Sequence, residues 1–298
     1  MLIVDLDNTL IKTDILYEMF FRLLTHKPLL AIKSLFSIFK GKANFKQAVA
    51  QYSKVVPEEL PYNIKVLEII NKYKDQNNKI ALISAADQSV VTQIANHLDV
   101  FDYAYGSDGV SNLSGKEKLQ WIQKRFPGEK FAYIGDCKSD LHIWSEADQI
   151  ITATKSKTLQ NTVNRLSITK PKQTIHLYPE CDSNKFLPPM LLALRPHQWI
   201  KNILVFIPMF AEGVYSLEIF LLLFFCFLMF SLTASSVYII NDIIDVQSDR
   251  AHASKKNRPI ACGDLKIHEG LMLCAGLLFF VLLGSLIFLS FKFVFVVL

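Results

Sequence analysis

Two stretches of uncharged sequence constrain this chain more than any other feature. Residues 219–240 and residues 270–291 each run for 22 residues without a charged side chain. About 20 apolar residues are enough for one α-helix to cross the hydrocarbon core of a bilayer. The sequence that precedes them has the mixed polarity of a water-soluble domain. We therefore predict a soluble domain of residues 1–166, a proline-containing linker of residues 167–189, and a membrane domain of residues 190–298.

The soluble domain alternates short apolar runs with helix-like stretches. Residues 2–4, 80–83 and 131–134 are apolar runs, and each ends in polar side chains. Such runs are typical of buried parallel strands. Residues 62–73 and 88–98, between the runs, have the pattern of helices. This alternation predicts a doubly wound α/β fold, in which ligands bind at the carboxyl ends of the strands.

A helical insertion interrupts the alternation after the first strand. Residues 10–62 contain three helix-like pieces, which we expect to form a cap over the ligand site. The middle piece, residues 28–40, is amphipathic and basic. Two interpretations of it remain open: packing within the cap, or contact with a membrane surface.

A pair of carboxylates follows the first apolar run. Asp5 and Asp7 stand two residues apart in the sequence Asp-Leu-Asp-Asn-Thr, so in an extended strand their side chains point the same way. One carboxylate can attack phosphorus while the other donates a proton and later accepts one. The pair therefore indicates phosphoryl transfer.

Further phosphate and metal ligands follow the other runs. Ser84 can donate a hydrogen bond to a phosphoryl oxygen, and Lys118, near the start of a helix, can neutralise phosphate charge. Lys116 is an alternative for the second role because it also follows closely on the turn that precedes this helix. Asp136 and Asp140, after the third run, supply the hard oxygen ligands that Mg²⁺ prefers.

In this order, these elements resemble the motifs of the haloacid dehalogenase superfamily over about residues 1–165. The resemblance implies that Asp5 is the nucleophile that forms an aspartyl-phosphate and that Asp7 is the general acid and base. It also implies that the helical insertion is the family's cap, which closes over the substrate. The implied activity is Mg²⁺-dependent phosphomonoester hydrolysis. The implied phosphate ligands are Ser84 and Lys118, and the implied metal ligands are Asp5, Asp7, Asp136 and Asp140.

The membrane domain is predicted to cross the bilayer three times, at about residues 194–213, 217–240 and 269–291. The first crossing is inferred from charge, since its continuous apolar part covers only residues 203–211. The segment before the second span carries two glutamates and no Lys or Arg, whereas five basic residues lie between the second and third spans. The positive-inside rule then places the basic loop and the soluble domain in the cytosol. We expect a multi-pass protein of the inner cell membrane.

A second acidic motif closes the second predicted span. Asp242, Asp245 and Asp249 are spaced so that, on one continuous helix, they share a face. Three carboxylates on one face repel one another unless a cation is bound, and Mg²⁺ commonly joins carboxylates to substrate phosphates. Arg258 follows closely and can hold further phosphate oxygens. The sequence therefore predicts a Mg²⁺–phosphate site at the membrane edge, where such charge indicates function.

This motif resembles the first aspartate-rich motif of UbiA-like prenyltransferases. Residues 194–202 and 258–261 narrow the resemblance to the decaprenyl-phosphate phosphoribosyltransferase branch. The resemblance implies phosphoribosyl diphosphate as donor and a polyprenyl phosphate as acceptor, with a prenyl diphosphate and an aromatic acceptor as the alternative. Arg195 and Lys201 have a second interpretation, as anchors at the membrane interface. The implied substrate and phosphate ligands are Asn241, Arg195, Lys201 and Arg258.

Composition bears on the remaining function classes. The net charge is +5 and the basic residues form no long run, which favours anionic lipid or phosphate over nucleic acid as a partner. Five cysteines without CxxC spacing indicate a reducing compartment. The sequence ends in an apolar run and lacks the second aspartate motif of the UbiA-like family, so we expect a fragment or truncated product with impaired transferase activity.

Two hypotheses follow for the whole chain. In the first, a bifunctional enzyme joins a phosphoribosyl group to a polyprenyl phosphate, and its soluble domain removes the 5-phosphate that remains on the sugar. In the second, the membrane domain only anchors a phosphatase of an unrelated phosphomonoester. A role in binding or regulation, without turnover, is a third interpretation, which the intact acidic motifs disfavour.

Overall fold

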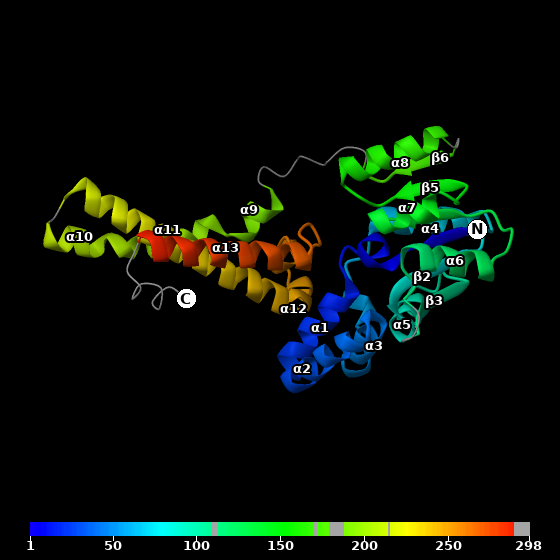
Figure 1. The fold of residues 1–298 in the computed structure, drawn as a ribbon, viewed down its shortest axis with the longest axis horizontal. Helices are drawn as coiled ribbons and strands as arrows, with labels where there is room; N and C mark the ends of the chain where they lie inside the picture. Colours follow the sequence, from blue (N-terminus) through cyan, green and yellow to red (C-terminus); the bar gives the residue numbers. More distant parts are fainter. Residues whose placement is uncertain (109–111, 170–171, 179–187, 214, 289–298) are drawn as a thin grey trace. The chain divides into compact units, whose positions relative to one another are not determined.

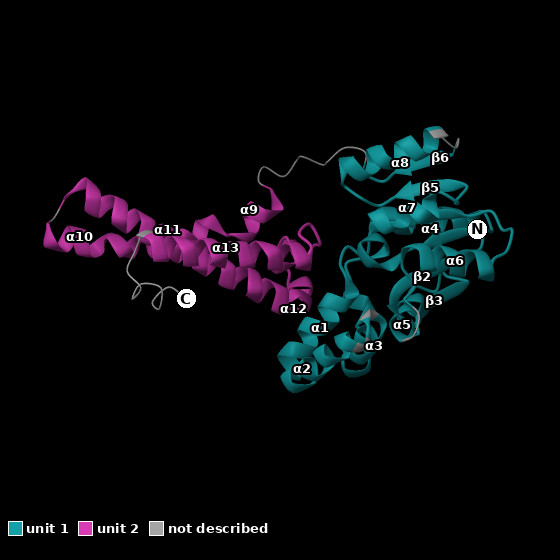
Figure 2. Cartoon of the chain, viewed as in Figure 1, with its two compact units in different colours: residues 1–184 teal, residues 185–298 magenta. Residues whose placement is uncertain are grey.

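The chain folds into two compact units, Met1–Asn184 and Lys185–Leu298 (Figures 1 and 2). Each is described by itself below as the N-terminal and the C-terminal unit. The computed structural model describes residues 1–108, 112–169, 172–178, 188–213 and 215–288.

A six-stranded sheet forms the centre of the N-terminal unit. Every pair of neighbouring strands is parallel, and the order is β3-β2-β1-β4-β5-β6 (Figure 1). The first strand, β1, therefore lies between the two other strands that end in predicted site residues. The doubly wound α/β fold predicted from the sequence is confirmed. The strands are β1 Leu2–Val4, β2 Ile80–Asp87, β3 Tyr103–Ser107, β4 Ala132–Gly135, β5 Gln149–Thr152 and β6 Gln173–His176.

Helices cover both faces of the sheet, which explains why its central strands read as continuous apolar runs. Leu2 and Val4 pack into the core on one face, and Ile3 packs into the core on the other. The first core takes in α4 (Ile64–Asp75) and α5 (Gln88–Leu98). The second core lies under α6 Gly115–Arg125, α7 Leu141–Trp144 and α8 Lys157–Thr169.

The insertion after β1 forms a separate group of helices (Figure 1). An isolated antiparallel bridge between Ile11 and Tyr62 joins the two chain segments at its base. Asp14 caps the first helix by accepting a hydrogen bond from the backbone N–H of Leu16 at 3.0 Å, and Pro28 occupies the first turn of the second, where no N–H is needed. The elements are α1 Ile15–His26, α2 Pro28–Phe36, the 3₁₀ turn Ser37–Lys40, α3 Lys42–Tyr52 and the 3₁₀ turn Pro57–Glu59.

The N-terminal unit extends further than the predicted boundary at residue 166. Helix α8 continues to Thr169, and β6 lies inside the predicted linker, paired with β5. This edge strand has only four residues, and its side chains are half-buried or exposed, so its sequence shows no apolar run. The part of the predicted linker at residues 170–171 and 179–187 lies outside the described residues.

The C-terminal unit contains the two long apolar helices, α11 (Leu217–Ile244) and α13 (Ile267–Phe288). Among the described residues these two are long and apolar enough to cross a membrane, and only 17% and 28% of their most apolar windows are buried. A soluble core helix would be mostly buried. The last residues of the third predicted span, 289–291, lie outside the described residues.

The segment predicted as a first span does not form one continuous α-helix. It consists of a 3₁₀ helix, η5 (Pro196–Phe206), followed by the short helix α10 (Ile207–Glu212). Pro208 lies in the first turn of α10, since a proline inside a longer helix would remove a hydrogen bond and clash with the preceding turn. A side-chain hydrogen bond joins η5 to α11, in which Trp199 Nε1 donates to Ser235 Oγ at 3.0 Å. The remaining elements are α9 Pro189–Ala193, α12 Val246–Ala251 and the 3₁₀ turn Lys255–Asn257.

Candidate active site

Asp5 follows β1 directly and forms a buried ion pair. Its Oδ1 atom accepts a hydrogen bond from Lys118 Nζ at 2.7 Å and another from the backbone N–H of Leu6 at 2.9 Å. The exposed fraction of Lys118 is 2% and that of Asp5 is 9%. Burial raises the pKa of Asp5, and the charge of Lys118 opposes that effect. The lysine therefore favours the ionised carboxylate that a nucleophile requires.

Lys118 also connects Asp5 to the loop after β4. Its Nζ donates to Tyr133 Oη at 3.0 Å, and that hydroxyl donates to Asp140 Oδ1 at 2.9 Å. Lys116, the alternative from the sequence, is exposed, whereas Lys118 lies on the inner side of the first turn of α6. The structure thus brings Lys118, and not Lys116, to the predicted nucleophile.

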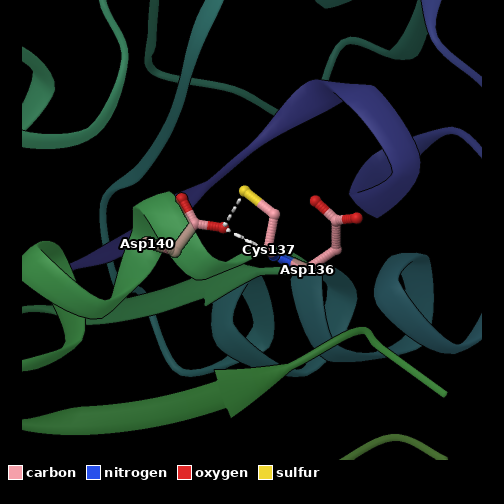
Figure 3. A group of neighbouring side chains, drawn as sticks. All are labelled: Asp136, Cys137 and Asp140. Atoms are coloured by element: carbon pink, nitrogen blue, oxygen red, sulfur yellow. Dashed lines mark hydrogen bonds between the residues drawn. The ribbon is translucent and has the colours of Figure 1, made fainter. Parts of the chain in front are cut away.

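Asp140 organises the loop that carries Asp136. Its Oδ2 atom accepts hydrogen bonds from the backbone N–H groups of Asp136 and Cys137, both at 3.1 Å (Figure 3). The carboxylates of Asp136 and Asp140 lie on either side of the Cys137 side chain (Figure 3). Gly135 is required for this turn, because a Cβ atom there would lie 2.5 Å from Asp140 Oδ2. Asp140 is thereby occupied in holding the backbone, and it positions Asp136.

The same loop can hold a metal ion. One ligand atom from each of Asp136, Cys137 and Asp140 lies within 4.8 Å of the others. Burial raises the pKa of Cys137 to about 12, so this group remains a thiol at neutral pH and is a poor ligand. The carboxylate of Asp5 is close enough to Asp140 for their charges to interact. A set of carboxylate oxygens suits Mg²⁺, and the residues present fit this ion.

Asp7 differs from Asp5 in its electrostatic surroundings. Its Oδ1 atom accepts a hydrogen bond from the backbone N–H of Ile15 at 2.9 Å, at the start of the cap. Burial raises the pKa of Asp7 well above its usual value, and the charge of Asp14 raises it further. Two neighbouring carboxyl groups, of which one is paired with a lysine and the other keeps its proton more readily, match the roles of nucleophile and general acid.

Ser84 is fully buried in the second half of β2. Its Oγ accepts a hydrogen bond from the backbone N–H of Ala86 at 3.0 Å, which leaves the hydroxyl proton as a donor. Beside Asp7, the Oγ1 atom of Thr9 is buried and has no hydrogen-bond partner among the described residues. Both hydroxyl groups are therefore buried and retain a proton that they can donate to a ligand.

Lys46 is a site residue that the sequence did not identify. It lies on cap helix α3, and its Nζ donates to the backbone oxygen of Ala85 at 2.7 Å and to Asn112 Oδ1 at 2.9 Å. Burial lowers the pKa of Lys46, while the charges of Asp7 and Asp14 oppose that effect. The cap therefore brings a positive charge to the acidic residues of the core. A single lysine in a helix gives little sequence signal for such a role.

The acidic motif of the C-terminal unit forms an ion-pair cluster. Arg258 Nη1 contacts Asp242 Oδ1 at 3.1 Å and Asp249 Oδ2 at 2.6 Å. Arg195 also pairs with Asp242, and its guanidinium lies 5.2 Å from the ring centre of Tyr238. Asp242 and Asp249 are both buried, and Asp249 Oδ1 has no hydrogen-bond partner among the described residues. Lys255 Nζ lies 3.9 Å from that oxygen, which is an ion pair beyond hydrogen-bond distance. Two buried carboxylates, one of them with an oxygen that accepts no hydrogen bond, fit a cation such as Mg²⁺.

The rest of this motif is arranged differently from the sequence prediction. Helix α11 ends at Ile244 and a new helix starts at Val246, so the continuous helix assumed for the three aspartates is broken at Asp245. Asp245 is exposed, as is Asn241. Lys201 is exposed on η5 and makes no ion pair with the motif among the described residues. The structure therefore gathers Arg195, Asp242, Asp249 and Arg258, and leaves Asn241, Lys201 and Asp245 outside the cluster.

Family comparisons agree with this division of the chain. Residues 2–144 match the family model of the haloacid dehalogenase-like hydrolases, and residues 203–298 match that of the UbiA prenyltransferase family. The chain thus has an N-terminal haloacid dehalogenase-like hydrolase domain and a C-terminal UbiA prenyltransferase domain. Both resemblances read from the motifs are confirmed.

Particular relatives extend the comparison. The chain is 37% identical over 274 residues to the protein y4nM of Sinorhizobium fredii, a match that covers 92% of this chain and 52% of that protein. It is 45% identical over 76 residues to a decaprenyl-phosphate phosphoribosyltransferase of Mycobacterium tuberculosis, covering 24% of this chain and 25% of the transferase. The chain thus spans about half the length of the first relative and a quarter of the second. A structure of phosphoserine phosphatase with a phospho-aspartyl intermediate analogue matches at 17% identity with a TM-score of 0.36, covering 58% of this chain and 91% of that chain.

Proposed function

We propose that the N-terminal unit is a Mg²⁺-dependent phosphomonoesterase in which Asp5 is the nucleophile and Asp7 the general acid and base. The observation that supports these roles most directly is the difference between the two carboxyl groups. Asp5 is paired with Lys118 at 2.7 Å, whereas burial and Asp14 favour the protonated form of Asp7. Two carboxyl groups whose pKa values differ in this way can be ionised and protonated at the same pH, one as nucleophile and the other as acid.

The reaction follows from these positions. A carboxylate oxygen of Asp5 attacks phosphorus, the bond from phosphorus to the leaving oxygen breaks, and Asp7 gives its proton to that oxygen. Water then attacks the phosphorus of the aspartyl-phosphate, Asp7 takes a proton from the water, and Asp5 is released. Lys118 and Ser84 stabilise the charge on the phosphoryl oxygens during both steps. Mg²⁺, held by Asp5 and Asp136 with Asp140 as their support, would supply further charge neutralisation when bound.

Hydrolysis of p-nitrophenyl phosphate by the full chain tests this proposal. We expect release of nitrophenol in MgCl₂, its loss in EDTA, and its loss in Asp5→Asn. The matched control is Asp75→Asn, at an exposed aspartate near the end of α4. Equal activity of the Asp5 and Asp75 variants would contradict the proposed nucleophile.

We also propose that the C-terminal unit is embedded in a membrane and contributes to a site for a phosphoribosyl diphosphate donor and a polyprenyl phosphate acceptor. The UbiA match, the transferase relative and the apolar helices α11 and α13 support this. In the structure Arg195 and Arg258 neutralise Asp242 and Asp249. When Mg²⁺ and a diphosphate enter, the two arginines can pass from the carboxylates to phosphate oxygens, which guanidinium groups bind in the same geometry.

Binding in detergent or nanodiscs distinguishes between the two donors. At a fixed MgCl₂ concentration, we expect phosphoribosyl diphosphate to raise the melting temperature of the C-terminal unit above its value in MgCl₂ alone, and Arg258→Gln to abolish that further shift. If a prenyl diphosphate raises the melting temperature and phosphoribosyl diphosphate does not, the result would favour prenyl transfer to an aromatic acceptor.

The two proposed activities suit one another. Phosphoribosyl transfer leaves a 5-phosphate on the sugar, and a tethered phosphatase meets that phosphate at a raised effective concentration. This arrangement requires the N-terminal unit on the cytosolic side, as the basic loop of the C-terminal unit predicts. We expect the full chain with Mg²⁺ to release inorganic phosphate from a phosphoribosyl lipid. A strong preference for a soluble phosphomonoester would instead indicate an anchored phosphatase of unrelated substrate.

A further inference from the structure

The second cap helix, α2, has its large apolar side chains on the outside. Leu29 is 81% exposed and Phe36 is 66% exposed, whereas the buried positions of the helix are the small residues Ala31 and Ser34. The 3₁₀ turn that follows continues this pattern, with Phe39 90% exposed. A helix that covers a protein core shows the opposite arrangement, with its large apolar residues facing inward. Packing within the cap therefore uses mainly Ala31 and Ser34, with the half-buried Leu30, and leaves most of the large apolar residues of α2 exposed.

The exposed apolar residues of α2 and of the turn that follows it lie close together in the sequence, and we call them the apolar cap face. Six large hydrophobic residues within twelve positions are too many to be the isolated apolar residues of an ordinary surface. Such a concentration of exposed apolar residues indicates an interaction site. Its members are Leu29, Ile32, Leu35, Phe36, Ile38 and Phe39.

Charge in the chain segment that carries the apolar cap face is of one sign. Residues 19–57, which include all of α2 and α3, contain no Asp or Glu. Lys27 and Lys33 are exposed beside the apolar residues. A cation-rich segment without acids complements an anionic surface. The basic residues of the segment are Arg22, Lys27, Lys33, Lys40, Lys42, Lys46 and Lys54.

Apolar and basic residues together match the surface of a bilayer that contains anionic lipid. Amphipathic helices with Leu and Phe on one side and Lys at the border lie in the headgroup region, where both kinds of group are satisfied. A bilayer is available in the same chain's surroundings if its helices α11 and α13 cross one, and both are long and apolar enough to do so. A tethered surface needs only weak affinity to be occupied.

We propose that the apolar cap face docks on the anionic surface of the membrane that α11 and α13 cross. This inference rests on the proposed membrane placement of the C-terminal unit. Docking places the exposed side of α2 at the level of the lipid headgroups. The proposed phosphatase would then take phosphomonoesters presented at a lipid surface.

Bromolipid quenching of a single introduced tryptophan in the full chain tests the docking. Phe39→Trp is the probe, and Ile168→Trp is the matched control, because Ile168 is also a highly exposed apolar residue (81%, against 90% for Phe39) and lies on α8 of the same unit. Both are read in nanodiscs as the difference from the parent chain, which corrects for its own three tryptophans. We expect strong quenching of the residue 39 probe with anionic lipid and little quenching of the residue 168 probe.

Charge reversal tests the electrostatic part. Each basic residue near an anionic membrane contributes roughly fivefold to binding, so Lys27→Glu with Lys33→Glu should abolish quenching of the residue 39 probe, as should zwitterionic lipid or high salt. Two outcomes would overturn the docking but not the membrane placement. One is equal quenching of the two probes, and the other is no quenching of either probe in protein that co-purifies with nanodiscs. Concentration-dependent dimers that protect residue 39 would show that a second copy covers the face, and would overturn it too. Failure of the chain to enter nanodiscs would overturn the membrane placement itself.

Discussion

Replacement of Lys118 by methionine is the perturbation whose size the structure defines best. Methionine keeps most of the side-chain volume and removes the charge. Asp5 then remains buried without its counter-ion, and Tyr133 loses a donor at 3.0 Å. Removing one partner of a buried ion pair costs about 3–5 kcal/mol. For a unit of this size the melting temperature should fall by about 6–20 °C.

Lys116→Met is the matched control. Lys116 lies two residues earlier on the same helix and is exposed, so its replacement should change stability by no more than about 0.5 kcal/mol. The assay is thermal unfolding in EDTA, followed by near-ultraviolet circular dichroism of the buried Tyr133 and Trp144. Equal melting temperatures for the two variants would refute the account of the Asp5–Lys118 pair.

The stability difference between the Lys118→Met and Lys116→Met variants should also depend on pH. Burial already raises the pKa of Asp5 in the folded state, and without Lys118 nothing of comparable size opposes that effect. A carboxyl group with a raised folded pKa holds its proton longer in the folded than in the unfolded state, so stability is lost as pH rises above the unfolded value of about 3.9. The difference between the two variants should therefore be smallest near about pH 4 and largest at neutral pH. A difference that is constant with pH would show that lost packing, and not charge, is the cause.

Four further outcomes are expected. Asp7→Asn should lower kcat by about 10²–10⁴, and the loss should be larger for an alkyl phosphate, whose leaving group needs the proton, than for p-nitrophenyl phosphate. Because the pKa of Asp7 is raised, the parent chain should stay active to a higher pH than an ordinary aspartic acid allows. Its activity should fall once the pH exceeds that raised pKa. Lys46→Met should raise KM about tenfold, a loss of about 1.4 kcal/mol, with little change in kcat, whereas the exposed Lys54→Met should leave both unchanged; an unchanged KM would remove Lys46 from the site. Gly135→Ala should raise the MgCl₂ concentration for half-maximal activity at least tenfold, since its methyl group meets Asp140 Oδ2; activation identical to that of the parent chain would show that the loop tolerates the methyl group. Arg258→Gln should lower the melting temperature of the C-terminal unit in EDTA, and millimolar MgCl₂ should restore it more than in the parent chain; a variant insensitive to MgCl₂ would argue against a cation site there.

The sequence predicts the fold well where the strands are buried on both faces. Residues 2–4 and 80–83 are apolar runs because helices cover both sides of β1 and β2. Helix α5 begins and ends at the residues that the helical sequence pattern predicts, 88 and 98. The edge of the sheet gives a weaker signal. Strand β3 is only half-buried and contains a glycine, and β6 alternates exposed with half-buried residues, so neither forms an apolar run.

Within the site, the sequence identifies residues better than it identifies their contacts. Asp5, Ser84 and Asp136 can be grouped because the carboxyl ends of parallel strands meet at one edge of the sheet, whereas Lys118 lies in the first turn of α6 and is predicted from its position after the turn that precedes this helix. Lys46 escapes this reasoning because its role depends on how the cap closes over the core. Asp245 was placed with the other aspartates on the assumption of an unbroken helix, and the break after Ile244 removes it from their cluster.

Direct detection of the phosphorylated residue tests the central claim. The full chain is mixed with excess p-nitrophenyl phosphate and MgCl₂, quenched, and reduced with borohydride, which converts an acyl phosphate to an alcohol. The reduced peptides are then located by mass spectrometry. We predict that Asp5, and no other aspartate, is converted to homoserine, and that Asp5→Asn gives no conversion. Turnover without any reduced residue, or reduction at a different aspartate, would contradict the account.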